Sequence, residues 1–363
     1  MTSRRVFLKA AAGFAGVAAF PACAGAPAEP GVARFWHAEG DAVACELCPN
    51  GCVLRDGVTG VCRTRRNDNG QLVTLGYGNP CAVHVDPIEK KPLYHVMPGA
   101  RTFSIAVAGC NFRCKNCQNH TISQASPLDT RNIHLSPRGV VERAVRSGCT
   151  AIAYTYSEPT VWYEYMYDTA KLARKAGMKN LLITCGYINE KPLAELADYM
   201  DAANIDLKGF DAQTYRKLNA GRLDAVLSTL KRARELGIWV EVTNLIVPEW
   251  TDSIDTIREM CAWLYDNLGA NTPLHFSRFH PMHKLAHLPP TPRKTLEQAR
   301  LAALESGLSY VYLGNVAGAN TDTRCPSCGK TVVRRRGYLI LENKVNAGAC
   351  TFCGKGVAGV WCA

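Results

Sequence analysis

Three cysteines in one short segment have the spacing of a metal–thiolate centre. Cys110, Cys114 and Cys117 follow one another as C-x3-C-x2-C. Three thiolates that converge on one loop suit an iron–sulfur cluster, and they leave one iron of a four-iron cluster without a protein ligand. An iron with an open position can bind a chelating substrate or cofactor. A structural zinc ion usually has four protein ligands, so the triad favours the cluster.

Two further cysteine groups flank this triad in the chain. The first has C-x2-C-x3-C-x9-C spacing, which suits a structural zinc ion and an auxiliary iron–sulfur cluster equally well. Disulfides are the third alternative for the first group if the chain is exported. The second group consists of two C-x2-C pairs, each followed by Gly, and this spacing predicts a zinc ribbon. The members are Cys45, Cys48, Cys52 and Cys62 in the first group, and Cys325, Cys328, Cys350 and Cys353 in the second.

The composition favours a metalloprotein with a substantial core. The 363 residues include 17 Cys, and 47% are hydrophobic and 20% charged, which excludes wholesale disorder. The net charge of +11 is spread along the chain, so we expect no nucleic-acid partner. No apolar run approaches the roughly 20 residues of a spanning helix, so we expect no transmembrane segment in the mature chain.

The first residues have the pattern of an export signal. Arg4 and Arg5 lie in S-R-R-x-F-L-K, an apolar run and small residues follow, and the whole resembles a twin-arginine signal. We expect a signal peptide over 1–24 and a Pro- and Ala-rich linker over 25–34. This route carries folded proteins, so it predicts a metal centre inserted in the cytoplasm and a chain exported to the periplasm or cell envelope. Action in the cytoplasm before export is the alternative.

Alternating strand and helix patterns position the triad. Helices with capping signals, such as the Ser136-Pro137 pair, separate apolar strand patterns. Six or seven such units predict a parallel sheet. Polar residues just after the strand ends favour a partial (β/α)6-type TIM barrel with its site at the carboxyl rim. The expected strands are 102–108, 151–155, 179–184, 202–207, 239–247, 273–279 and 310–313.

The same patterns divide the chain into domains. We expect a Cys-rich N-terminal segment over 35–95, the barrel over 96–320 and a small zinc-ribbon-like domain over 321–363. The N-terminal segment has few long apolar runs, so it needs a metal or the neighbouring barrel to become ordered. The predicted fold class is therefore α/β, with two small cysteine-rich additions.

An ordered set of short motifs accompanies the triad. The motifs are KPLYH at 91–95, GCNF at 109–112, CQN at 117–119, TYSEP at 155–159, DLK at 206–208, FHPM at 279–282 and YLGNV at 312–316. Together they resemble the radical S-adenosylmethionine (radical SAM) superfamily. Within it, they are similar to the AmmeMemoRadiSam-system enzymes, which are relatives of the pyruvate formate-lyase activating enzymes. The resemblance covers roughly residues 45–316.

This resemblance implies cofactors and partners. Cys110, Cys114 and Cys117 would ligate a [4Fe–4S] cluster, and the methionyl amine and carboxylate of S-adenosylmethionine would bind its fourth iron. One-electron reduction then cleaves the sulfonium to a 5′-deoxyadenosyl radical, so a reductase or flavodoxin-like protein is the expected electron donor. Memo-like and AMMECR-like proteins are the implied functional partners.

The resemblance also implies roles for individual side chains. Glu158 would contact the methionyl amine, although a helix-start carboxylate is the alternative. Lys208 would contact the cofactor carboxylate or the substrate, with a surface lysine as the alternative. Asn116 stands where many members have an aromatic residue beside the adenine, a packing role that Phe112 can also fill. Cys185 stands where relatives commonly have Asn, and we expect a buried, inert thiol there.

The predicted function is that of a radical SAM enzyme that abstracts hydrogen from an unknown substrate. Two alternatives accompany it. The first is an activase that forms a glycyl radical on a partner enzyme. The second is a non-catalytic, exported iron–sulfur electron-transfer or metal-binding protein.

Overall fold

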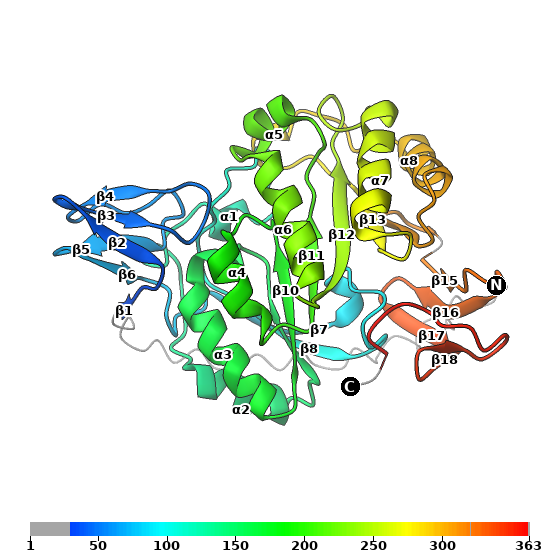
Figure 1. The fold of residues 1–363 in the computed structure, drawn as a ribbon, viewed down its shortest axis with the longest axis horizontal. Coiled ribbons are helices and arrows are strands. Elements are labelled where there is room, and N and C mark those ends of the chain that lie inside the picture. Colours follow the sequence, from blue (N-terminus) through cyan, green and yellow to red (C-terminus); the bar gives the residue numbers. More distant parts are fainter. Residues whose placement is uncertain (1–29, 320, 362–363) are drawn as a thin grey trace, which may run out of the picture.

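One eight-stranded sheet forms the centre of the molecule (Figure 1). In this computed structural model, residues 30–319 and 321–361 are described. The strands are β7 (Ala82–Pro87), β8 (Arg101–Ala106), β9 (Ala151–Tyr154), β10 (Lys179–Thr184), β11 (Ala202–Asp206), β12 (Trp239–Ile246), β13 (Leu274–Arg278) and β14 (Val311–Gly314). Their order is β14-β13-β12-β11-β10-β9-β8-β7, with β8 to β14 parallel and β7 antiparallel to β8. The sheet is open in the described residues, because β14 and β7 are its edges.

Helices connect the parallel strands, and α3, α4 and α6 lie across the near face of the sheet in Figure 1. The α-helices are α1 (His120–Ser123), α2 (Pro137–Arg146), α3 (Tyr163–Lys175), α4 (Glu190–Ala197), α5 (Ala212–Asn219), α6 (Leu223–Glu235), α7 (Ile254–Leu268) and α8 (Arg293–Glu305). The 3-10 helices are η1 (Ile88–Lys90), η2 (Pro159–Trp162) and η3 (His283–Leu285). Helix α2 begins as predicted, since Ser136 Oγ accepts a hydrogen bond from Gly139 N–H at 3.2 Å. Among the described residues, no helix has the length and apolarity needed to cross a membrane.

The α/β class with a central parallel sheet is confirmed, and each of the seven expected strands is present at its expected place. Three features differ from the expectation. The sheet has all seven of the expected parallel strands, one more than a (β/α)6-type barrel has, and closure into a barrel is not seen in the described residues. Strand β7 joins the central sheet from within the segment expected to be core-poor, since Val83 and Val85 pack against the main core. Helix α5 was not predicted, and its buried apolar side chains are those of Tyr215 and Leu218.

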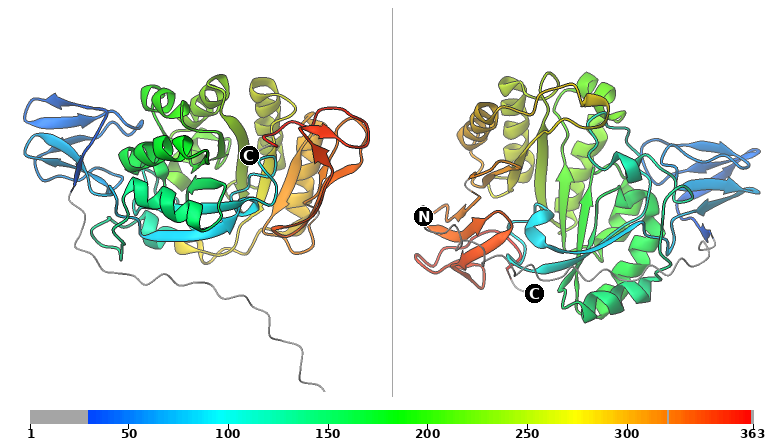
Figure 2. Two further views of the ribbon diagram at one scale, coloured as in Figure 1. Left: turned by 90° about the horizontal axis from the view of Figure 1, so that it is seen from below. Right: turned by 180° about the vertical axis from the view of Figure 1, so that it is seen from behind.

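Two small sheets form an N-terminal module beside the central sheet (Figures 1 and 2). Their strands are β1 (Gly31–Val32), β2 (Trp36–Glu39), β3 (Ala42–Cys45), β4 (Val53–Arg55), β5 (Arg65–Asp68) and β6 (Gln71–Thr74), in the orders β2-β3-β4 and β1-β6-β5. Strand β1 includes residues expected to be linker, because it pairs with β6. The predicted signal peptide lies outside the described residues. The module's apolar cluster is small, so it needs further contacts to be stable.

A C-terminal module packs on the other side of the central sheet (Figure 2). Its strands are β15 (Thr323–Arg324), β16 (Thr331–Arg336), β17 (Leu339–Asn343), β18 (Val345–Asn346) and β19 (Ala349–Cys350). Arg335 joins it to the centre, because its guanidinium donates to the backbone oxygen of Tyr94 at 2.7 Å. The backbone of Val360 pairs with His95 and Met97 at 2.7 and 2.8 Å. The module is therefore an integral part of the fold.

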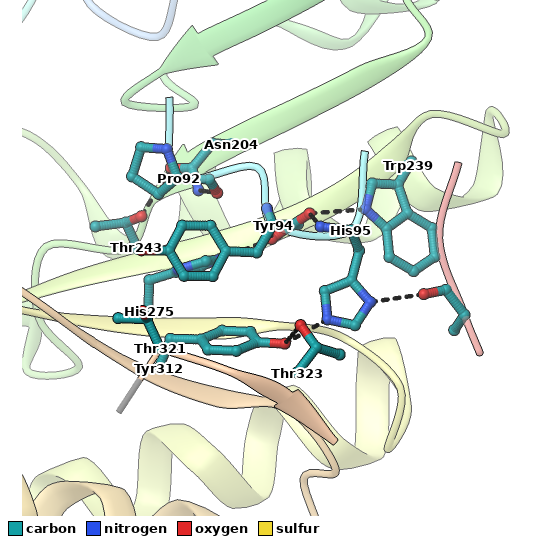
Figure 3. A network of polar contacts seen from close by, with 12 residues as sticks. Pro92, Tyr94, His95, Asn204, Trp239, Thr243, His275, Tyr312, Thr321 and Thr323 are labelled. Carbon is teal, nitrogen blue, oxygen red and sulfur yellow. Dashed lines mark hydrogen bonds and ion pairs between the residues drawn. The ribbon is translucent and has the colours of Figure 1, made fainter. Parts of the chain in front are cut away.

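A network of polar contacts, which includes the labelled Tyr94, His95, His275 and Tyr312, lies at the amino end of the sheet (Figure 3). Glu241 on β12 accepts hydrogen bonds from the backbone N–H groups of Tyr94 and His95 at 3.0 and 2.8 Å, and its Oε2 lies 2.7 Å from His275 Nε2. His95 Nε2 lies 2.6 Å from the Tyr312 hydroxyl. Burial alone would raise the pKa of Glu241, but its contacts with the two histidines lower it. The KPLYH motif at 91–95 and the YLGNV motif at 312–316 therefore meet at the amino end of the sheet. In barrels, that end serves stability.

Candidate functional site

The central cysteines lie on the loop after β8, at the carboxyl end of the parallel sheet. Cys114 is buried, and Cys110 and Cys117 are half-buried. Burial raises the pKa of Cys110 well above its usual value, and the charges of Glu158 and of the other two thiols act in the same direction. The three thiols are therefore mutual neighbours beside a carboxylate. Thiols bind metal as thiolates, so metal binding to this loop displaces protons.

Each thiol of the triad has a polar neighbour. The pairs are Phe112 N with Cys110 Sγ at 3.3 Å, Asn219 Nδ2 with Cys114 Sγ at 3.2 Å, and Ser123 Oγ with Cys117 Sγ at 3.1 Å. Hydrogen bonds to cysteine sulfurs are one of the ways in which a protein sets the reduction potential of an iron–sulfur cluster. The loop therefore carries thiols and the groups that tune them.

The carboxyl end of α5 holds the triad loop in place. The N–H groups of Arg113 and Lys115 donate to the backbone oxygens of Asn219 and Leu218, both at 2.9 Å. A Cβ at Gly221 would lie 2.2 Å from the Phe112 ring, so this close approach requires glycine. Sequence analysis missed Asn219, because an Asn at a helix end usually reads as a turn or cap residue.

Glu158 is buried beside the triad and joins the ends of two strands. Its Oε1 accepts hydrogen bonds from Thr160 N–H at 3.0 Å and from the Thr184 hydroxyl at 2.6 Å. Its Oε2 accepts one from Cys185 N–H at 2.8 Å. The contact with Thr160 caps η2, so the predicted helix-start role is present. Oε2 keeps an acceptor position for a further donor, because a carboxylate oxygen accepts two hydrogen bonds.

Asn116 and Lys208 lie next to the triad cysteines. Asn116 is buried, and its Oδ1 has no hydrogen-bond partner among the described residues. Such an acceptor costs free energy unless a ligand supplies a donor. Lys208 is half-buried, with its Nζ 2.8 Å from Asp206 Oδ2. Burial alone would lower the pKa of Lys208, but Asp206 and the nearby thiol of Cys114 raise this pKa well above its usual value. The Lys208 side chain is therefore a charged ammonium.

Two residues near the triad serve packing. The Phe112 ring is fully buried, 4.7 Å from the Tyr187 ring, so it belongs to the core and does not offer a surface to a cofactor. Cys185 is buried as expected, with its Sγ 3.5 Å from Asn111 Oδ1. Burial, followed by the charge of Glu158, raises the pKa of Cys185 well above its usual value, which disfavours the reactive thiolate.

A cavity opens at the carboxyl ends of β11 and β12, next to Lys208. Its volume is about 250 Å³. Asn244 lines it, and Asn244 Oδ1 is buried without a hydrogen-bond partner among the described residues. Trp250 also lines the cavity and packs against Lys115 of the triad loop. The Lys115 ammonium lies 4.7 Å from the centre of the Trp250 ring. The cavity therefore adjoins the loop that carries the cysteines.

Comparison with known proteins identifies the family. The family model of the radical SAM superfamily matches residues 104–264, which include the triad, Glu158 and Lys208. An uncharacterized protein of Methanocaldococcus jannaschii is 49% identical over 318 residues, which are 86% of this chain and 94% of that protein. The chain belongs to the radical SAM superfamily.

Other similarities are weaker. The pyruvate formate-lyase-activating enzyme of Clostridium pasteurianum is 25% identical over 174 residues, which are 45% of this chain and 68% of that enzyme. The solved structure of Streptococcus suis SuiB bound to the precursor peptide SuiA has a TM-score of 0.47 and 13% identity, and covers 64% of this chain and 52% of SuiB. Membership of the superfamily implies a [4Fe–4S] cluster and S-adenosylmethionine as cofactors. Three neighbouring thiols, a carboxylate oxygen with a free acceptor position and the unpaired Asn116 oxygen fit that pair of groups.

The C-terminal module of this radical SAM protein brings four cysteines together. The sulfur atoms of Cys325, Cys328, Cys350 and Cys353 all lie within 4.8 Å of one another. Cys325 and Cys353 are 3.7 Å apart, and Cys328 and Cys350 are 3.8 Å apart. Four thiolates bound to one metal ion at about 2.3 Å in a tetrahedron are separated by about 3.8 Å. This group can therefore bind a metal ion in addition to the central cluster.

The N-terminal cysteines also meet. Cys45, Cys48, Cys52 and Cys62 line one cavity together with Arg65 and Val161. Cys48 and Cys62 are buried, and the other two are half-buried. No cysteine within the described residues forms a disulfide.

Proposed function

We propose that this protein is a radical SAM enzyme that cleaves S-adenosylmethionine reductively and abstracts a hydrogen atom from an unidentified substrate. One observation carries the proposal: three thiols, which would leave one iron of a four-iron cluster without a protein ligand, adjoin a buried carboxylate, Glu158, and an unpaired amide oxygen, on Asn116. The bound cluster and S-adenosylmethionine supply a 5′-deoxyadenosyl radical. Membership of the superfamily supports this reaction class.

The side chains have separate roles in this proposal. Glu158 Oε2 accepts a hydrogen bond from the methionyl ammonium, while Thr184 and Cys185 hold the carboxylate in position. Asn116 Oδ1 accepts one from the adenine amine, which removes the cost of its unpaired state. The ammonium of Lys208, which Asp206 keeps charged, pairs with the carboxylate of the cofactor or the substrate.

Anaerobic turnover tests the proposal. The reconstituted chain would be reduced with dithionite and assayed for 5′-deoxyadenosine, beside a triple variant, Cys110→Ala, Cys114→Ala, Cys117→Ala. Cys149→Ala is the matched control, because Cys149 is buried at the amino end of β9, away from the triad. Product from wild type and control, and none from the triple variant, supports the proposal. An intact central cluster that gives no product would favour the electron-transfer alternative.

A second candidate is an activase that abstracts hydrogen from a glycine of a partner enzyme. The relative named pyruvate formate-lyase-activating enzyme favours it, at 25% identity. The assay distinguishes it, since an activase converts one S-adenosylmethionine per partner chain and leaves a protein radical visible by electron paramagnetic resonance. A low-molecular-weight product formed over many turnovers contradicts it. Memo-like and AMMECR-like proteins are the first partners to add.

Zinc in the C-terminal cysteine group and export by the twin-arginine route complete the proposal. Sulfur separations of 3.7 and 3.8 Å support zinc, which is bound by four thiolates in structural sites. Arg4 and Arg5 support export. Cell fractionation of a C-terminally tagged chain, beside its Arg4→Lys, Arg5→Lys variant, tests the location. Equal amounts of the two chains in the periplasm would exclude the twin-arginine route.

A further inference from the structure

The N-terminal cysteines surround a shared, largely dry space. All four side chains line the cavity described above, whose other lining includes Leu47, Leu54 and Val161. Four thiols in an apolar cavity are a complete ligand set for one metal centre. Cys81 belongs to the same segment but does not line the cavity, and its Sγ lies 3.5 Å from the Ala106 oxygen. The set therefore has four members.

The spacing of these sulfurs separates them from the C-terminal group. Within the described ranges, the C-terminal four are the group whose sulfurs all lie within 4.8 Å of one another, and neither Cys45, Cys48, Cys52 and Cys62 nor the central triad forms such a group. One zinc ion holds four sulfurs at tetrahedral separations of about 3.8 Å. A four-iron cluster instead binds each cysteine at a different iron, so its ligands stand further apart. At least one sulfur pair of the N-terminal set is therefore more than 4.8 Å apart, as in the triad.

This set is in direct contact with the triad loop. The backbone N–H of Cys110 donates to the backbone oxygen of Cys62 at 3.2 Å. A ligand position of the N-terminal set is thus one hydrogen bond from a ligand of the central cluster. Asn50 Nδ2 donates to the Asn111 oxygen at 3.0 Å, and Thr64 Oγ1 lies 3.2 Å from the Ala108 oxygen, so three contacts fix the two loops together.

Buried and half-buried arginines offset the negative charge of two neighbouring thiolate centres. Arg65 is 1% exposed, and its NH1 donates to Cys45 Sγ at 3.2 Å, while its NH2 pairs with the buried carboxylate of Glu164. Arg63 lies within electrostatic reach of both Cys62 and Cys110. A cation hydrogen-bonded to a ligand sulfur stabilises the reduced, more negative form of a cluster. These charges therefore suit a centre that accepts an electron.

We propose that Cys45, Cys48, Cys52 and Cys62 bind an auxiliary [4Fe–4S] cluster, which passes one electron to the central cluster through the contact between Cys62 and Cys110. A low-potential donor of the flavodoxin or ferredoxin class reduces the auxiliary cluster by one electron. The auxiliary cluster then returns to its oxidised form as the central cluster gains that electron. No covalent bond changes in either step. The relay rests on the proposed function, whereas the auxiliary cluster itself does not.

Metal content tests the auxiliary cluster independently of activity. The full chain is reconstituted with iron and sulfide, and iron, sulfide and zinc are counted per chain in wild type and in a Cys45→Ala, Cys52→Ala variant. These two cysteines are half-buried, so their loss disturbs packing less than loss of Cys48 or Cys62. We expect roughly eight irons in wild type and roughly four in the variant. The control Cys81→Ala keeps the wild-type count.

The triple triad variant completes the count. It keeps roughly four irons, and the electron paramagnetic resonance signal of its reduced cluster does not change when S-adenosylmethionine is added. The Cys45→Ala, Cys52→Ala variant keeps a signal that does change, which also shows that its central site is folded. A variant that loses zinc and no iron, or a triad variant that holds no iron, overturns the auxiliary cluster.

The choice of reductant tests the relay. With a reduced flavodoxin as donor, we expect formation of 5′-deoxyadenosine to slow roughly tenfold or more in the Cys45→Ala, Cys52→Ala variant, because the central cluster is then reached only directly. With dithionite the variant stays within about twofold of wild type, since a small reductant needs no relay. Equal rates with flavodoxin, or an equal loss with both reductants, overturn the relay. If the wild-type chain forms no 5′-deoxyadenosine with dithionite, the proposed function is refuted. The iron count would still test the auxiliary cluster.

Discussion

The backbone N–H of Cys185 donates a hydrogen bond to Glu158 Oε2 over 2.8 Å. This bond joins the residue after β10 to the residue four positions after β9, at the carboxyl rim of the sheet. The carboxylate is consequently fixed before any cofactor binds, and its acceptor positions point where two neighbouring strands end. Preorganisation of this kind reduces the entropy lost when a ligand binds.

Glu158→Gln should weaken binding of S-adenosylmethionine. The variant keeps one acceptor oxygen but loses the charge that pairs with the methionyl ammonium, which is worth about 1.5–3 kcal/mol, or roughly a 10- to 100-fold increase in Kd. Equilibrium dialysis against the cluster-loaded chain measures this. Glu259→Gln, at an exposed position on α7, is the control. An unchanged Kd with reduced stability would show that Glu158 serves only as a helix cap.

Asn219→Ala should lower the reduction potential of the central cluster. The variant removes the N–H donor at 3.2 Å from Cys114 Sγ, and with it a stabilisation of the reduced form. A loss of about 1 kcal/mol corresponds to a decrease of roughly 40 mV for one electron. A redox titration followed by electron paramagnetic resonance measures the potential. An equal shift in Asn189→Ala, which alters an Asn on the N-terminal side of α4, would contradict a specific effect.

Gly221→Ala should damage the triad loop. The added Cβ would lie 2.2 Å from the Phe112 ring, and overpacking of this kind costs about 1–3 kcal/mol. We expect a lower melting temperature and less iron per chain after reconstitution. Gly314→Ala is the matched control, because its Cβ would meet only ordinary contacts, the nearest at 3.7 Å from Ser277 Oγ.

His95 should make the stability of the fold depend on pH. Burial, partly opposed by the charge of Glu241, lowers the pKa of His95 to about 4 from its ordinary value of 6.5. Between these values the unfolded chain binds a proton that the folded chain does not, so the free energy of unfolding falls as the pH falls, by about 1.4 kcal/mol per pH unit. Denaturant unfolding of the metal-free chain between pH 5 and pH 6.5 (about 2 kcal/mol in total) measures the slope. His95→Gln removes this part of it, and identical slopes in the two proteins would contradict the assignment.

Cys328→Ala should remove the metal of the C-terminal module and leave the central chemistry intact. Cys328 lies 3.8 Å from Cys350 and is exposed, so its loss opens the tetrahedral group without a cavity in the core. We expect about one zinc ion fewer per chain and faster proteolysis within 321–361. Formation of 5′-deoxyadenosine with dithionite stays near wild type. Loss of iron from the variant would contradict a separate zinc site.

The parallel strands and the triad were predictable because they depend on local sequence. The seven parallel strands are short apolar runs, and the C-x3-C-x2-C spacing places its thiols on a single loop. Asn219 was not predictable, since it reaches Cys114 from a helix 105 residues away in sequence. No local pattern records such a contact.

The KPLYH and YLGNV motifs show a second limit of prediction from the sequence. They were recognised as part of the family resemblance, but their position could not be read from their sequence. The structure places His95 and Tyr312 at the amino end of the sheet, opposite the triad, where His95 contacts both Tyr312 and Glu241. Residue type alone could not show this, because histidine and tyrosine are equally suitable for a catalytic site and for a buried structural network. The burial of both side chains in the folded chain is what distinguishes the two roles.

The contacts of His95 also set the order in which the chain can be completed. Its backbone oxygen and its Nδ1 bind Val360 and Ala358, whose sequence distance exceeds 260 residues. A nascent chain therefore cannot close the base of its sheet until residues 358–360 have left the ribosome. Residues 358–360 thus complete the base of the sheet, and a chain cut before Ala358 leaves His95 and its buried partners exposed.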